Sequence, residues 1–222
     1  AACGSGPVFE FGVYKGASLR LLAKLMPEAA LFGFDSFAGF PQDGRTDWDV
    51  DFAVDTLPNM PSNVTLVPGY FNETLPQFLS EHGDIPSLRL LNIDCDIYSS
   101  TKTVLDHLDP YMGPGLVISF DELLNYAEFL QNEFLALYEF LQRRELDFEW
   151  IAFLGHYWAL EDFLAWRKKG PHKGGFRALR NRGYHQTAAI RIVPRAADYD
   201  IELMHHRAKA ERLATQFCEI FA

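Results

Sequence analysis

Four acidic side chains follow two apolar segments of the sequence, where they could act together on a cation or a proton. Asp94 and Asp96 come directly after the run LLNI, and Asp121 and Glu122 come directly after LVISF. Carboxylates of like charge are costly to place side by side unless a positive group lies between them. No Lys or Arg stands beside these acids, Lys102 being the nearest that follows Asp96. We therefore predict that Asp94, Asp121 and Glu122 bind Mg²⁺, a hard ion that prefers oxygen ligands. The alternative is that Asp96 or Asp121 caps the next helix and Glu122 points to solvent.

A glycine-containing turn after the first apolar segment is compatible with a cofactor site. In FEFGVYKGAS, Glu10 is followed by Gly12 and Gly16, and glycines let the backbone approach a ligand closely. The turn is neither G-x-G-x-x-G nor a P-loop, which disfavours a dinucleotide or a triphosphate. It suits S-adenosylmethionine, which has no pyrophosphate, and we predict cofactor contacts from Glu10, Gly12, Tyr14, Gly16 and Ser18. A purely structural strand–helix turn is the alternative.

Two further segments supply groups that suit a nucleoside. Asp35 follows the second apolar segment, where a carboxylate can accept the hydroxyls of a ribose, and Ser36 stands next to it. Either residue could instead cap a following turn. Gly69, Tyr70 and Phe71 follow the third segment and suit the edge and face of an adenine, although aromatic side chains are more often part of a core.

These residues must be positioned by strands and helices that alternate along the chain. The sequence predicts strands over residues 7–13, 29–37, 64–71, 88–96 and 114–122, and helices over 16–26, 99–112 and 123–144. Near-continuous apolar strands between helices predict an α/β fold with a Rossmann-like, doubly wound, mostly parallel sheet. Ligands of such sheets bind beyond the carboxyl ends of the strands, where all the candidate residues stand. We expect strands 147–155 and 184–194 to form an antiparallel pair that closes the sheet.

The domain organisation follows from length and composition. The 222 residues are expected to form a single domain, with a basic and aromatic insertion at 156–184 and a C-terminal helix at 198–222. The insertion is read as solvated surface or as a cationic flap over an acidic partner. The C-terminal helix is expected to pack on its own domain, with a homo-oligomer contact as the alternative.

Charge and cysteine content exclude several classes of partner. The chain has 20 Lys and Arg against 30 Asp and Glu, a net charge of −10, which argues against nucleic acid and anionic membranes as partners. Three widely spaced cysteines indicate a reduced, cytoplasmic protein. We find neither a signal peptide nor a membrane span in the sequence.

Taken together, the motifs resemble the macrocin O-methyltransferase family. The likeness runs through FEFGVYKGAS, FGFDSFAGFP, GYFNETLPQFL, NIDCDIYSST and VISFDELLNY and returns at HQTAAIRIV, with FDSFAGFP and DCDIYSST the most specific parts. The resemblance implies a class I methyltransferase fold, S-adenosylmethionine as methyl donor, Mg²⁺, and a hydroxyl of a sugar or another natural product as acceptor. By position it implies a cofactor turn at Glu10, Gly12 and Gly16, a ribose acid at Asp35, a metal ligand and general base at Asp94, and an acidic pair at Asp121 and Glu122.

The chain also departs from that family. Glu122 stands where a second aspartate is usual, Cys95 stands where glycine is common, and we expect the N-terminal cover of the site to be absent or very short. A catechol-type O-methyltransferase and a non-catalytic binding domain of the same fold remain alternatives. His156 and His185 remain alternative bases.

Overall fold

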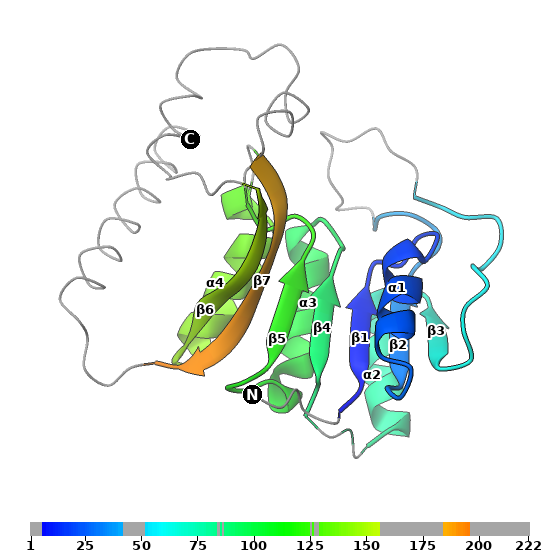
Figure 1. Cartoon of the computed structure of the whole chain (residues 1–222), viewed down its shortest axis with the longest axis horizontal. Coiled ribbons are helices and arrows are strands. Elements are labelled where there is room, and N and C mark those ends of the chain that lie inside the picture. Colours follow the sequence, from blue (N-terminus) through cyan, green and yellow to red (C-terminus); the bar gives the residue numbers. More distant parts are fainter. Residues whose placement is uncertain are drawn as a thin grey trace, which may run out of the picture.

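The computed structural model describes residues 6–41, 52–83, 85, 87–124, 126, 129–155 and 184–195 of the chain. Within these residues, seven strands form a single sheet in the order β3-β2-β1-β4-β5-β7-β6 (Figure 1). The strands are β1 Val8–Phe11, β2 Leu31–Asp35, β3 Val64–Pro68, β4 Leu90–Ile93, β5 Val117–Phe120, β6 Leu146–Gly155 and β7 Tyr184–Pro194.

Strand directions confirm the predicted fold class. β3, β2, β1, β4 and β5 pair in parallel, while β7 runs antiparallel to both β5 and β6. The chain therefore has a mostly parallel sheet with one antiparallel strand. The carboxyl ends of β1, β2, β4 and β5 consequently lie along one edge, which is where a doubly wound sheet binds its ligands.

Four α-helices cover the described part of the sheet. They are α1 Ala17–Leu25, α2 Phe71–Glu81, α3 Tyr98–Leu108 and α4 Glu133–Arg143, with short 3₁₀ turns η1 Asp109–Tyr111 and η2 Phe129–Gln131. Helices α2, α3 and α4 lie in a row on one face, and α1 lies on the other (Figure 1). No helix in the described residues is both long and apolar enough to cross a membrane.

An aromatic core holds α2 against the first strands. The Phe11 and Phe34 rings stack with their centroids 4.6 Å apart, and Phe78 of α2 meets Phe34 edge-on at 5.1 Å. Aromatic pairs of this kind stabilise by about 0.5–1.5 kcal/mol beyond their buried area. The core therefore fixes β1 and β2, whose ends carry candidate site residues.

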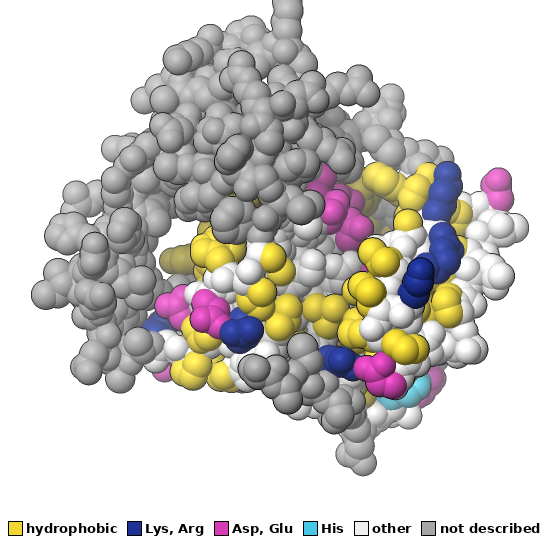
Figure 2. All heavy atoms as spheres, viewed as in Figure 1, with side chains coloured by type: hydrophobic (Ala, Val, Ile, Leu, Met, Phe, Trp, Pro, Cys, Tyr) yellow, Lys and Arg dark blue, Asp and Glu magenta, His cyan; other side chains and the backbone are white. Residues whose placement is uncertain are grey.

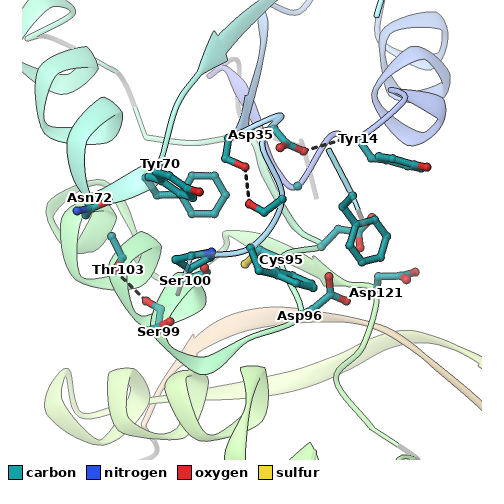
Figure 3. Close-up of a pocket in the computed structure, with 18 of the residues that line it drawn as sticks. Tyr14, Asp35, Tyr70, Asn72, Cys95, Asp96, Ser99, Ser100, Thr103 and Asp121 are labelled. Carbon is teal, nitrogen blue, oxygen red and sulfur yellow. Dashed lines mark hydrogen bonds between the residues drawn. The ribbon is translucent and has the colours of Figure 1, made fainter. Parts of the chain in front are cut away.

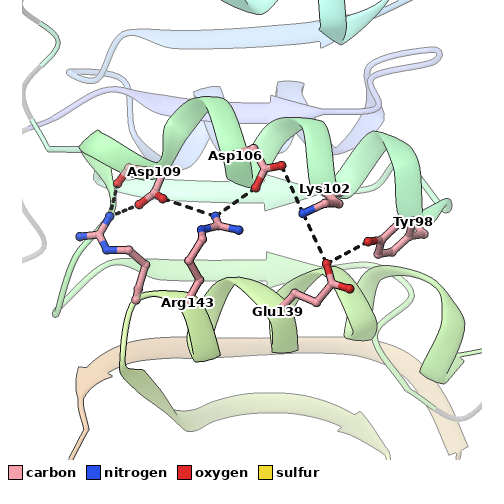
Figure 4. A network of polar contacts seen from close by, with 7 residues as sticks. Tyr98, Lys102, Asp106, Asp109, Glu139 and Arg143 are labelled. Atoms are coloured by element: carbon pink, nitrogen blue, oxygen red, sulfur yellow. Dashed lines mark hydrogen bonds and ion pairs between the residues drawn. The ribbon is translucent and has the colours of Figure 1, made fainter.

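The row of helices is also joined on its outer surface. Lys102 of α3 lies 3.2 Å from Asp106 and 3.4 Å from Glu139 of α4, and the Tyr98 hydroxyl donates to Glu139 at 2.8 Å (Figure 4). Arg143 bonds back to Asp106 at 3.0 Å. The side chains are partly exposed, so each pair contributes little, about 0.2–1 kcal/mol, but together they fix the register of α4 on α3.

The predicted helix over 123–144 is wrong in its first part. The backbone N–H groups of Leu123 and Leu124 donate to the Gln186 carbonyl, at 3.0 and 3.3 Å. These two residues therefore bond to β7 and do not form the first turn of a helix. Helix α4 begins only at Glu133. Residues 156–183 of the predicted insertion lie outside the described residues, and its last residue, Tyr184, is the first of β7. The predicted helix at 198–222 lies outside the described residues entirely.

Candidate active site

A cavity of about 540 Å³ opens at the carboxyl ends of β1, β2, β4 and β5. This volume is in the range of small-molecule sites. Figure 2 shows a group of Asp and Glu side chains at this edge of the sheet, and Figure 3 shows the lining from close by. Nine residues proposed from the sequence line it, namely Gly12, Tyr14, Asp35, Ser36, Tyr70, Phe71, Asp94, Asp121 and Glu122.

Asp35, at the end of β2, organises one side of the cavity. Its Oδ2 accepts hydrogen bonds from the backbone N–H groups of Val13 and Tyr14, each at 2.7 Å, and its Oδ1 accepts one from Phe37 at 2.7 Å (Figure 3). The carboxylate thus caps its own turn and also holds the turn after β1. A carboxylate has about four acceptor positions, so three backbone bonds leave capacity for a ligand hydroxyl.

Gly12 lets the ends of β1 and β4 approach each other. Its φ of 91° is in the region that only glycine adopts readily, and a Cβ built there would lie 1.7 Å from the Asp94 carbonyl oxygen. The Asp94 backbone N–H in turn donates to Phe11 at 2.8 Å. The predicted requirement for glycine therefore comes from close packing against Asp94, at the wall of the cavity.

Asp94 and Asp121 lie close together at the ends of neighbouring strands. The Asp121 backbone N–H donates to Ile93 at 3.0 Å, and the Thr187 hydroxyl donates to Asp121 Oδ1 at 3.2 Å. Burial, followed by the negative charges of Asp121 and Asp96, raises the pKa of Asp94 to about 8. The negative charges of Asp121 and Asp96 thus disfavour the ionised form of Asp94, as expected for acids placed side by side.

The predicted three-carboxylate metal site receives no support from the geometry. Asp94, Asp121 and Glu122 line the same cavity, but the described residues contain no group of three or more His, Cys, Asp or Glu side chains arranged to hold a metal ion. The donor chemistry of the Asp94–Asp121 pair still fits Mg²⁺, which is bound in many proteins by one or two carboxylates and water. A cation would also relieve the repulsion that raises the pKa of Asp94.

Glu10 and Ser18 lie beneath the cavity and do not line it. Glu10 is fully buried, accepting a hydrogen bond from the Ser18 hydroxyl at 2.9 Å and another from Asn92 Nδ2 at 2.9 Å. Burial raises the pKa of Glu10 to about 7. The carboxyl group therefore joins α1 to β4 and is not among the residues that line the cavity, where a contact with the ammonium group of the donor was predicted.

Gly16 and Gly69 shape the turns around the cavity instead of lining it. Gly16 is the N-cap of α1 with φ of 71°, and a Cβ there would lie 2.9 Å from Met60 Cε. Gly69 has φ of 130° and precedes Tyr70, the N-cap of α2. Both glycines are needed by the backbone, whatever the ligand.

Several lining residues were not predicted. Polar groups come from the start of α2 and the first turns of α3, and apolar ones from the segments that flank residues 42–51. They are Asn72, Ser99, Ser100 and Thr103, and Gly39, Phe40, Pro41 and Phe52, with Cys95 and Asp96 between them. The spacing of Ser99 and Thr103, four residues apart in a helix directly after the acids, was the available signal, since such residues share a face.

A buried acid on α4 was also missed. Glu133, the first residue of α4, is fully buried. Burial, followed by the charges of Asp96 and Asp94, raises the pKa of Glu133 well above its usual range. Burial and the neighbouring acids therefore favour the protonated, uncharged form of this carboxyl group.

The histidines give no alternative base within the described residues. His82 stacks on Phe78, with centroids 4.0 Å apart, at the end of α2 away from the cavity. His107 is in the last turn of α3. His156 and the side chain of His185 lie outside the described residues.

Comparison with solved structures gives the same fold for proteins of low sequence identity. The calicheamicin methyltransferase CalS11 matches with a TM-score of 0.55 and 24% identity, over 84% of this chain and 72% of CalS11. A second structure of it, entitled TDP-rhamnose 3′-O-methyltransferase, gives a TM-score of 0.51. The O-methyltransferase NovP matches with a TM-score of 0.52 and 23% identity, over 66% of this chain and 67% of NovP.

Comparison with curated proteins found no match. The sequence model of a family, described as "Methyltransferase domain", matches residues 9–123. This match covers more than half of the 222 residues and includes the ends of β1, β2, β4 and β5 that build the cavity. The chain therefore belongs to this family of methyltransferase domains.

Proposed function

We propose that the chain is an S-adenosylmethionine-dependent O-methyltransferase that acts on a hydroxyl group of a small molecule. One observation carries the proposal: the ends of four neighbouring strands place Gly12, Asp35, Asp94 and Asp121 around a single cavity of about 540 Å³. Membership of the methyltransferase family supports the donor, and the resemblance to macrocin O-methyltransferases supports the hydroxyl acceptor.

The methyl donor is assigned to the side of the cavity near β1, β2 and α2. Asp35 would accept one ribose hydroxyl at the position that its three backbone bonds leave free, and Tyr70 and Phe71 would lie against the adenine. Gly12 and Tyr14 would face the amino-acid tail. Glu10 would act from below by holding Ser18 and Asn92, not by touching the donor.

The acceptor hydroxyl is assigned to the side with Asp94 and Asp121. Its oxygen attacks the methyl carbon, the carbon–sulfur bond breaks toward sulfur, and the hydroxyl proton passes to the Asp94 carboxylate. The products are the methyl ether and S-adenosylhomocysteine. Alignment of the two reactants supplies most of the acceleration, since positioning contributes on the order of 7–11 kcal/mol at best.

Mg²⁺ is part of the proposal. Asp94 and Asp121 would hold it, and Glu122 would lie beside them on the same cavity wall. When bound, the ion would lower the pKa of an acceptor hydroxyl.

A catechol-type acceptor is the second candidate, and a specific observation favours it. Tyr14, Phe40 and Phe52 form an aromatic group beside the acids, with Phe52 edge-on to Tyr14 at 5.4 Å and to Phe40 at 5.3 Å. Aromatic side chains can pack edge to face or offset-stacked against a planar ring such as a catechol. A cytoplasmic location remains an expectation, as do a small-molecule partner and a homo-oligomer.

The test is transfer of a labelled methyl group from S-adenosylmethionine to a panel of sugars, glycosides and catechols, read as label in the product and as S-adenosylhomocysteine formed. We expect at least one hydroxyl compound to be methylated. Stoichiometric donor binding without transfer to any acceptor would favour the non-catalytic binding domain.

A further inference from the structure

We infer that the cavity excludes anionic acceptors, so that the methyl acceptor is a neutral or cationic hydroxyl compound and not a phosphorylated or nucleoside diphosphate sugar. The inference names the substrate class of the site and rests on the proposed function.

The lining of the cavity has a strongly one-sided charge. Among the described residues that line it, five are acidic and none is Lys, Arg or His; the acids are Asp35, Asp94, Asp96, Asp121 and Glu122. Figure 2 shows the acidic side chains that gather at this edge of the sheet. A phosphate or diphosphate is usually bound by Arg, Lys or a helix N-terminus that offers free backbone N–H groups.

Basic side chains on the neighbouring elements are engaged elsewhere. Lys15 lies over the ring of Tyr14, 4.9 Å from its centroid, and Arg20 donates to the Lys15 and Asn59 carbonyls at 2.6 and 3.2 Å. Lys102 is held by Asp106 and Glu139 on the outer surface of α3 (Figure 4). None of the three lines the cavity.

The bound reactants would not reverse this charge. The five acids outnumber the three positive charges that the reactants would bring, a net +1 on S-adenosylmethionine and +2 on a magnesium ion, and four acids still outnumber them when Asp94 is protonated. An acceptor with two phosphate charges would add to that excess of negative charge, and like charges repel.

The uncharged part of the lining also favours neutral or cationic acceptors. Tyr14, Phe40 and Phe52 form one aromatic group, and Tyr70 and Phe71 stand across the cavity. Aromatic faces bind apolar faces and cationic groups but not anions. The acids and the rings therefore select for the same acceptor classes.

The first test compares acceptors that share a scaffold and carry substituents of different charge. Methyl transfer is measured for catechol, dopamine and 3,4-dihydroxybenzoate, and for rhamnose and TDP-rhamnose, each with and without added Mg²⁺. For any scaffold that is methylated, we expect kcat/KM for the anionic member to be at least tenfold below that of its neutral or cationic partner. Equal or faster methylation of 3,4-dihydroxybenzoate or TDP-rhamnose would overturn the inference. Absence of transfer to every compound would count against the proposed function instead, and the second test then decides the inference.

The second test measures the charge of the cavity without an acceptor. S-adenosylmethionine and S-adenosylhomocysteine differ by one positive charge, and their Kd ratio is measured by calorimetry for the wild type, Asp96→Asn and Asp121→Asn. Asn tolerates the φ of 64° at position 96, and at position 121 it can still accept the Thr187 hydrogen bond. Each variant is expected to lower the preference for the cationic donor at least threefold. Glu81→Gln, an exposed acid at the far end of α2, is the matched control and should leave the ratio unchanged. An unchanged ratio in both site variants would refute the negative cavity.

Discussion

Single residues at the carboxyl edge of the sheet have separable roles, and Asp94 is assigned the chemistry. Asp94→Asn keeps the shape of the side chain but cannot take a proton. Since general base catalysis contributes about 10²–10⁴-fold, we expect kcat to fall at least 100-fold while the Kd for S-adenosylhomocysteine changes less than threefold. Asp106→Asn, on the outer surface of α3, is the control and should retain turnover. Wild-type turnover in Asp94→Asn would remove the catalytic role.

Glu10 predicts a pH dependence of stability. Its pKa rises from 4.5 to about 7 on folding, so its contribution is fully present below pH 4.5 and is lost as the pH rises through 7. The loss amounts to roughly 3 kcal/mol in the free energy of unfolding. Glu10→Gln is neutral at every pH and can keep bonds to Ser18 and Asn92.

We therefore expect Glu10→Gln to gain stability relative to the wild type between pH 5 and pH 8, as measured by urea unfolding at both values. Comparing each variant with the wild type at the same pH cancels the other titrating groups. A difference between the two proteins that does not change with pH would contradict the buried, protonated Glu10.

The same residue shows why the site could be predicted only in part from sequence. The types and order of Gly12, Asp35, Asp94 and Asp121 were predictable, because each follows an apolar strand and parallel strands end at one edge. The hydrogen bonding of the buried Glu10 side chain was not predictable, because its partner Asn92 is 82 residues away in the sequence. Nor could spacing alone show that Asp94, Asp121 and Glu122 share a wall without forming a three-ligand group.

At the scale of elements, the close approach of β1 and β4 gives a stability prediction. Gly12→Ala places a Cβ 1.7 Å from the Asp94 carbonyl and requires φ near 91°. We expect a loss of about 2–5 kcal/mol in the free energy of unfolding, through strain and overpacking. Gly113→Ala is the matched control, since a Cβ there has no atom within 4 Å, and it should change stability by less than about 0.5 kcal/mol. Equal stability of the two variants in urea unfolding would refute the close packing of Gly12 against the Asp94 carbonyl.

The elements that were predicted well are those with local signals. Strand positions and the antiparallel β6–β7 pair followed from apolar runs bounded by turns. The start of α4 did not, because Leu123 and Leu124 take their hydrogen-bond partner from β7. Helix α2 was not assigned from sequence, and it contains Pro76, which removes one helical hydrogen bond and weakens the helical pattern.

On the scale of the whole molecule, the sheet brings acids from different strands to one cavity, and the role of Mg²⁺ is testable there. We expect EDTA to lower methyl-transfer turnover at least tenfold, and added Mg²⁺ to restore it, because a cation between Asp94 and Asp121 relieves their repulsion. Asp121→Asn should then raise the Mg²⁺ concentration needed for half-maximal turnover. Full turnover after EDTA treatment and dialysis would contradict a requirement for Mg²⁺.

The most direct measurement of the central claim is calorimetric titration of S-adenosylhomocysteine into the wild type and Asp35→Ala. The account predicts one equivalent bound by the wild type and at least tenfold weaker binding by the variant, because Asp35 both holds the turn after β1 and faces the cavity. Glu81→Gln should bind as the wild type does. No binding by folded wild-type protein, or equal affinity in Asp35→Ala, would contradict a methyl donor site at the carboxyl edge of this sheet.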